Sequence, residues 1–189
     1  MRQTSFEDFH CSLARTLEAI GDWWSPLILR DLAVGVRRFN DLVTDLGISR
    51  NLLTSRLNMM VEHAIVARQP VADHATHVEY VLTDAGHELV AVLMALTAWG
   101  DRWRTPEGGP PIEFHHHDHQ CVPVVSCRQC GELVDSSSVT FRAGPGGRRA
   151  PGTALIGTRM QPRVRPSRQS ADYTRYAGEI PSAAHRSTT

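Results

Sequence analysis

Apolar residues recur every three or four positions through four short segments near the start of the chain, which predicts four amphipathic helices. Glycines end the first three segments, and Ser49 is the expected cap of the fourth. The second opens on Ser25 and Pro26, with Ser25 as the expected cap and Pro26 in the first turn. The four apolar faces are Leu13, Leu17 and Ile20; Leu27, Ile28 and Leu32; Phe39, Leu42, Val43 and Leu46; and Leu53, Leu57, Met60 and Val61.

A change to strict alternation follows the fourth helix. Residues 66–71 and 77–83 alternate as β-strands do, and the polar segment 72–76 between them predicts a β-hairpin. Thr83 and Asp84 then cap a long helix through Trp103. Its apolar positions are Leu89, Val92, Leu93, Leu96 and Trp99. Four helices, a hairpin and a final helix predict a mainly α fold, a winged helix-turn-helix with flanking dimerisation helices.

The fourth helix has a polar face that suits DNA. Arginine and asparagine side chains can form paired hydrogen bonds with guanine and adenine edges, and hydroxyls suit phosphates or bases. A solvated surface is the alternative for any polar helix face, but the preceding helix and the hairpin wing favour contact with DNA. The predicted reading residues are Ser49, Arg50, Asn51, Thr54, Ser55 and Asn58.

Other basic residues are placed to hold the DNA backbone. We expect Arg37, Arg38 and Arg68 to contact phosphates, because they enter or follow the helix-turn-helix. His74 and His77 in the wing are placed to touch phosphate or the minor groove, unless these loop histidines are only solvated.

The overall charge of the chain limits how it could attract DNA. The formal net charge is zero, and the 20 basic residues are all arginine. Residues 1–105 hold 10 Arg against 13 acidic residues, so affinity for DNA must come from a local patch. The sequence shows no Ser/His/Asp order, Gly-rich phosphate loop or carboxylate pair, and we therefore expect no enzymatic activity.

Composition divides the chain into three zones. Residues 1–105 form the predicted winged-helix domain, 106–142 are rich in His and Cys, and 143–189 are rich in Gly, Pro, Arg, Ser and Thr. The last zone has too few bulky apolar residues to offset the entropy of ordering, which predicts a disordered tail. Neither a membrane span nor a signal peptide is expected, which favours a cytoplasmic location.

Several motifs resemble one family. The segment from Cys11 to Leu42, with GDWWSPLILRDL and RRFNDL within it, is similar to the HxlR-type winged-helix transcriptional regulators. EYVLTDAGHEL and ALTAWGDRW are similar to the second wing strand and final helix of that family. The resemblance covers Cys11 to about Arg104 and implies a bacterial homodimer, joined through its first and last helices, on a palindromic operator.

Cys11 lies where several members of that family carry a sensing cysteine. A thiol near a helix N-terminus is readily oxidised or alkylated because its pKa is lowered. The alternative is a small buried residue near the dimer interface, as free cysteines often are.

The second zone contains a candidate metal site. Cys127 and Cys130 form a CxxCG knuckle, and Cys121 lies six residues before it. With His119 as the fourth ligand, three thiolates and one imidazole would suit a structural zinc ion. His115, His116 and His117 offer the same nitrogen ligand. A reduced thiol pair, a redox switch and an inert polar strand are the alternatives.

The sequence therefore predicts a DNA-binding transcriptional regulator. The alternative function is a winged-helix and zinc-ribbon module that binds protein instead of DNA. The two differ at the recognition helix, since only the regulator needs Arg50 and Asn51.

Overall fold

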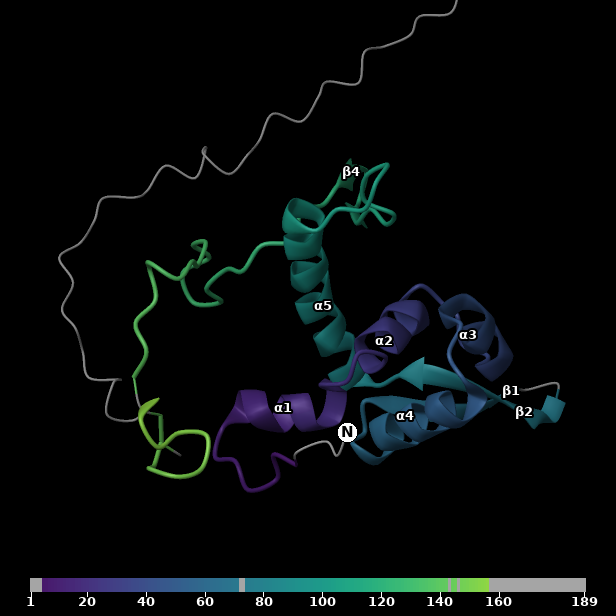
Figure 1. Ribbon diagram of the computed structural model, residues 1–189. Coiled ribbons are helices and arrows are strands. Elements are labelled where there is room, and N and C mark those ends of the chain that lie inside the picture. Colours follow the sequence, from purple (N-terminus) through teal and green to yellow (C-terminus); the bar gives the residue numbers. More distant parts are fainter. Residues whose placement is uncertain (1–4, 72–73, 143, 146, 157–189) are drawn as a thin grey trace, which may run out of the picture.

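The computed structural model describes residues 5–71, 74–142, 144–145 and 147–156, and for residues 74–77 the backbone alone. Five helices and two small hairpins follow one another along this part of the chain (Figure 1). The helices are α1 (Ser12–Ile20), α2 (Ser25–Ala33), α3 (Phe39–Leu46), α4 (Arg50–Glu62) and α5 (Asp84–Trp103). The strands are β1 (Val66–Val71), β2 (His74–Leu82), β3 (His115–His116) and β4 (His119–Gln120). The predicted winged helix-turn-helix is confirmed.

One hydrophobic core joins α2, α3 and α4 to the start of β1. Leu53, Leu57 and Met60 of α4 are fully buried, as their spacing of four and three residues predicts. They meet Ile28 and Leu29 of α2, together with Leu42 of α3 and Val66 of β1. This packing fixes one side of α4 and leaves its opposite side exposed.

Helix ends follow the predicted caps with one exception. The Ser49 hydroxyl accepts a hydrogen bond from the Leu52 amide at 3.4 Å, and the Thr83 hydroxyl accepts one from Gly86 at 3.2 Å. Ser25 does not cap α2: it is the first residue of the helix and is fully buried. The carboxylate of Asp22 replaces it, because it accepts hydrogen bonds from the Trp24 and Ser25 amides at 2.8 and 3.1 Å.

The turn between α3 and α4 is short and sharply defined. Gly47 ends α3 at φ +62°, a left-handed conformation in which a side chain is strained, and its amide donates to the Val43 carbonyl at 3.0 Å. Two residues later Ser49 starts α4. The closeness of these two ends makes α3 and α4 the helix-turn-helix.

The wing is longer than its sequence pattern suggests. β1 and β2 pair antiparallel from Val66↔Leu82 to Val71↔His74, with an irregularity after Pro70. We expected residues 72–76 to form the loop, but β2 already begins at His74. Strand pairing depends on backbone groups that every one of these residues carries, so a polar sequence does not prevent a strand here.

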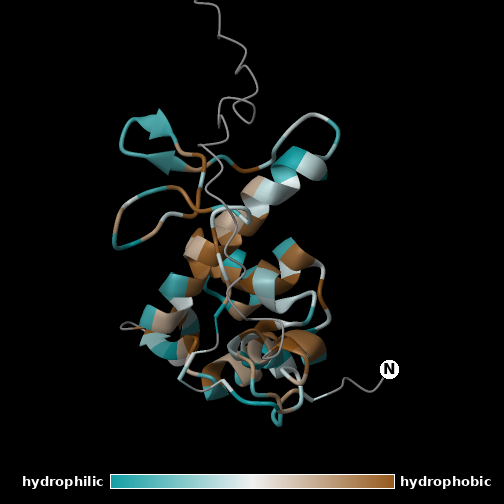
Figure 2. Ribbon diagram, turned by 90° about the vertical axis from the view of Figure 1, so that its left-hand side faces the viewer, coloured by the Kyte–Doolittle hydropathy of each residue, from teal (hydrophilic) through white to brown (hydrophobic). Residues whose placement is uncertain are grey.

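Two helices keep apolar side chains in solvent. Leu89 and Leu93 of α5 pack against the core, whereas other large residues of the same helix are more than half exposed. The exposed ones are Val92 at 60%, Leu96 at 58%, Trp99 at 54% and Trp103 at 60%. On α1, Leu13 is 67% exposed and Leu17 is 41% exposed. Figure 2 shows apolar segments along α5 outside the body formed by the other helices.

The chain after α5 forms small loops and hairpins. β3 pairs with β4, and a second turn is held by a bridge between Ser126 and Leu133. Later, the His10 amide donates to the Pro151 carbonyl at 3.1 Å, which ties residues 147–156 to the segment before α1. The predicted disordered tail falls mainly on residues 157–189, which lie outside the described residues. None of the described helices is long and apolar enough to cross a membrane.

Candidate nucleic-acid interface

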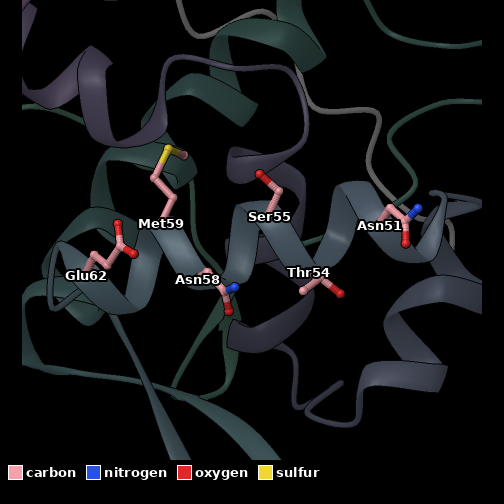
Figure 3. A pocket seen from close by; sticks show the side chains of 6 residues that line it. All are labelled: Asn51, Thr54, Ser55, Asn58, Met59 and Glu62. Carbon is pink, nitrogen blue, oxygen red and sulfur yellow. The ribbon is translucent and has the colours of Figure 1, made fainter.

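The exposed side of α4 carries a row of small polar side chains. Asn51, Thr54, Ser55 and Asn58 lie along the helix at spacings of three and four residues, opposite its buried face. With Met59 and Glu62 they line an open hollow (Figure 3). The structure therefore brings together four of the predicted reading residues on one surface.

Met59 and Glu62 were missed by the sequence reasoning, although they follow Ser55 and Asn58 by four positions each. The Glu62 carboxylate places negative charge at the C-terminal end of the hollow, where phosphates would be repelled. The N-terminal two turns of α4 are therefore the part that suits DNA.

Arg50 stands apart from this row. Its Nη1 donates to Asn40 Oδ1 at 2.9 Å, and its guanidinium carbon lies 4.9 Å from the centre of the Phe39 ring. Both contacts tie the start of α4 to the start of α3. The positive charge is thereby held at the helix-turn-helix junction, beside Ser49, and not along the hollow.

The wing contacts the recognition helix directly. Arg68 of β1 donates a hydrogen bond from Nη2 to Asn58 Oδ1, so a predicted phosphate ligand and a predicted reading residue are neighbours. Since the Asn58 oxygen is engaged, its amide nitrogen is the group left to donate to an acceptor on DNA.

Arg37 and Arg38 lie where the loop before α3 meets the wing. The Tyr80 amide donates to the Arg37 carbonyl at 2.9 Å, and Arg38 forms a bridge with Glu79. The Arg38 Nε lies 3.4 Å from Glu79 Oε1, so part of its charge is balanced within the protein. Arg37 is exposed. The side chain of His77 lies outside the described residues, as does that of His74.

Comparison with known proteins shows which family has this arrangement of helices and wing. The model of HxlR-like helix-turn-helix proteins matches residues 19–108. The HTH-type transcriptional regulator Rv3095 of Mycobacterium tuberculosis is 42% identical over 137 residues, which cover 71% of this chain and 87% of the relative. The chain belongs to the HxlR-like helix-turn-helix family.

Two solved structures agree with this assignment. The crystal structure of PA1607, described as a transcription factor, is 30% identical with a TM-score of 0.65, covering 75% of this chain and 99% of that one. The solved structure of PA1374 from Pseudomonas aeruginosa, described in the same way, is 36% identical with a TM-score of 0.51, covering 71% of this chain and 93% of that one. This HxlR-like protein is a DNA-binding transcriptional regulator.

The similarity to the mycobacterial regulator continues beyond the DNA-binding domain. An alignment of 137 residues cannot fit within residues 1–108, so it extends into the His/Cys zone of this HxlR-like chain. Part of the His/Cys zone is therefore similar in sequence to a relative.

Cys11 is the N-cap residue of α1 and is half-buried. Its backbone carbonyl accepts a hydrogen bond from the Arg15 amide at 3.0 Å, while its thiol makes no side-chain cap bond. The expected place at a helix N-terminus is confirmed by this geometry. A sensing role for the thiol stays a prediction.

Cys127 and Cys130 form the predicted knuckle. Gly131, at φ +74°, closes the turn with a hydrogen bond from its amide to the Cys127 carbonyl at 2.7 Å. Backbone amides of Cys130 and Gln129, together with the Cys130 thiol, donate to the Cys127 sulfur and lower its pKa. The turn therefore stabilises a thiolate at Cys127.

The other two predicted metal ligands are placed differently. The Cys121 amide donates to the Phe114 carbonyl at 2.7 Å, at the base of the β3–β4 hairpin. His119 pairs across that hairpin with His116. Among the described residues, no three His, Cys, Asp or Glu side chains converge as a metal site. The geometry thus fits half of the predicted zinc site, Cys127 with Cys130, and leaves His119 with a different neighbour.

Proposed function

We propose that this regulator binds a palindromic operator as a homodimer, with one α4 helix of each subunit in the major groove. The observation that carries the proposal is the row formed by Asn51, Thr54, Ser55 and Asn58 on the exposed side of α4. Amide and hydroxyl groups recognise base edges in the major groove, whereas a purely electrostatic binder would show a surface dominated by arginine.

Positive charges surround this row and would hold the DNA backbone. Arg50 lies at the N-terminal end of α4, Arg68 lies beside Asn58, and Arg37 lies at the entry to the wing. We assign phosphate contacts to Arg37, Arg38 and Arg68. Arg38 forms an ion pair with Glu79, and it must weaken this ion pair to contact a phosphate.

The exposed apolar faces of α1 and α5 support the dimer. Val92, Leu96, Trp99 and Trp103 repeat at spacings of three and four residues, so they form one stripe along α5. Contiguous apolar surface of this kind mostly marks an interface. A two-fold dimer would place two α4 helices about 34 Å apart on one side of the double helix.

The first test measures oligomeric state and operator binding on the same samples. Light scattering coupled to gel filtration should give twice the mass of one chain. Trp99→Glu should shift it to one chain and weaken binding to a full palindrome, because a single half-site then carries all contacts. His87→Gln, an exposed position on the side of the same helix away from the stripe, is the control and should keep the dimer. A wild-type protein that stays monomeric on DNA would contradict the proposal.

The remaining functional expectations stay predictions. They are a sensing thiol at Cys11, and a structural zinc ion held by Cys121, Cys127 and Cys130, for which the sequence offers His119 as one candidate fourth ligand. The geometry supports the knuckle half of the zinc site. We also place the regulator in the cytoplasm, where its DNA target is, and assign it no enzymatic activity.

A further inference from the structure

The β3–β4 hairpin concentrates imidazole side chains at its tip. Four of its residues are histidines, and the two-residue turn of His117 and Asp118 joins its strands. His117 adopts φ +56°, a left-handed conformation that histidine tolerates better than most residues in a tight turn. The turn makes His116 and His119 direct cross-strand neighbours.

Neighbouring rings on one face of this hairpin are close together. Residues directly opposite each other in an antiparallel pair project their side chains to the same face. The ring centres of His116 and His119 are 5.8 Å apart, with an angle of 82° between the ring planes. The His117 ring is tilted by 57° against that of His116, and the two ring centres are 4.1 Å apart.

This spacing fits two imidazoles that share one metal ion. With metal–nitrogen bonds of about 2.0–2.1 Å, two coordinating rings have centres roughly 5–6 Å apart. His119 Nδ1 lies 3.7 Å from Asp118 Oδ1, so a carboxylate lies near the pair without forming a hydrogen bond to it. Each neutral imidazole has one ring nitrogen with a free lone pair, which can bind a metal.

We propose that His116 and His119 bind a divalent transition-metal ion of the nickel, copper or zinc class, separately from Cys127 and Cys130. Imidazole is a preferred ligand for these ions, and two such ligands leave the other positions to water. The pair is exposed, so the ion can enter without any rearrangement of the core. This assignment gives His119 a partner within its own hairpin and removes it from the thiolate site.

His115 provides a matched control within the same hairpin. Successive residues of a strand point to opposite faces, so His115 faces away from its neighbour His116. Its Nε2 lies 3.3 Å from Glu113 Oε2. Replacing His115 removes an imidazole from the hairpin and leaves the proposed pair intact.

The experiment uses the full chain with Cys121, Cys127 and Cys130 replaced by serine, so that thiolates do not compete for the metal. Calorimetric titration with Ni²⁺ should show binding. His116→Gln and His119→Gln should each weaken it by about tenfold or more, whereas His115→Gln should leave it unchanged within about twofold. Far-UV circular dichroism checks that each variant keeps its helices.

A cobalt titration of the chain with its native cysteines separates the two sites. Thiolate ligands give Co²⁺ an intense charge-transfer band in the near ultraviolet, and imidazoles do not. His116→Gln combined with His119→Gln should keep this band and lose one binding event. If the chain with Cys121, Cys127 and Cys130 replaced binds no Ni²⁺, or if His115→Gln weakens binding as much as His116→Gln, the proposal is overturned.

Discussion

Asp22 and Arg56 connect the start of α2 to the middle of the recognition helix. Asp22 Oδ1 lies 3.3 Å from Arg56 Nε, and their side chains are only 8% and 21% exposed. The same carboxylate accepts hydrogen bonds from the Trp24 and Ser25 amides and from the Ser25 hydroxyl. One acidic side chain therefore caps α2 and forms an ion pair with α4.

Removing this carboxylate should destabilise the fold. Asp22→Asn keeps an acceptor for the helix cap but loses the charge facing Arg56, so we expect a loss of about 1 kcal/mol in the free energy of unfolding. Asp22→Ala loses both functions, and we expect about 2–3 kcal/mol. Urea denaturation followed by circular dichroism measures both values.

Glu79→Gln is the control for this prediction. It removes the partner of Arg38, whose side chain is 67% exposed, so the change should stay below about 1 kcal/mol. An Asp22→Ala variant no less stable than Glu79→Gln would show that the buried pair does not hold α4.

Residues that read bases and residues that bind phosphates should differ in how their replacement changes the salt dependence of DNA affinity. Asn51→Ala should weaken operator binding by about 10–100-fold and leave the slope of log affinity against log salt unchanged. Arg37→Ala should lower affinity for all sequences and reduce the slope by about 1. Fluorescence anisotropy at several salt concentrations measures both quantities.

Glu62→Gln tests the limit of the DNA-facing surface. Its carboxylate closes the hollow at the C-terminal end of α4, so removing the charge should leave operator affinity unchanged or raise it slightly. Weaker binding by Glu62→Gln would mean that this residue contacts the DNA bases, and the assigned surface would have to extend along the whole helix.

Local patterns predicted the helices well because periodicity and caps act within a few residues of each other. Ser49 and Thr83 cap their helices as expected. Ser25 failed as a cap because Asp22, three residues earlier, offers a charged acceptor to the same amides. That competition depends on how the chain turns before α2, which periodicity does not describe.

Side-chain directions were harder to predict than elements. Arg50 belongs to the polar face of α4, yet Asn40 and Phe39 of the preceding helix hold its guanidinium. His119 as a ligand beside the cysteines stays a prediction, but the CxxCG motif did not show that the turn at His117 pairs His119 with His116. Both outcomes depend on contacts between segments that a helix or motif pattern does not place in space.

Asp31 should make stability depend on pH in an unusual direction. Its side chain is 2% exposed, and burial raises the pKa of its carboxyl above the ordinary 3.8, although Arg30 opposes the shift. The folded state then binds a proton more tightly than the unfolded state, so ionised Asp31 destabilises the fold at neutral pH. This destabilisation should decrease as pH falls through the raised pKa, and disappear below the unfolded value.

Asp31→Asn tests whether the ionised carboxylate of Asp31 destabilises the fold. The variant should be more stable than wild type at pH 7, and the difference should shrink as the pH is lowered toward 4. Urea midpoints at a series of pH values measure it. A difference that grows on acidification would show that the pair with Arg30, whose Nη2 lies 2.6 Å from Asp31 Oδ1, outweighs the effect of burial.

In the metal-free chain, Cys127 should be the most reactive cysteine of the knuckle at neutral pH. Amides of Cys130 and Gln129 lower its pKa, so more of it is thiolate than of an ordinary cysteine. Its alkylation by iodoacetamide should exceed that of Cys130, and the rate should rise with pH at lower values than for a free thiol. Mass spectrometry of peptides from brief labelling reactions measures each site.

Gly131→Ala tests whether the turn causes this reactivity. An alanine at φ +74° is strained, so the turn should open, the amides should leave the sulfur, and Cys127 should react like a free thiol. Gly100→Ala in α5, where an added methyl group meets open space, is the control and should leave the rates unchanged. If Gly131→Ala labels as fast as wild type, the turn is not the source of the lowered pKa. Unfolding the chain in urea should remove the difference between the two thiols in every variant, because it depends on amides that only the folded turn orients.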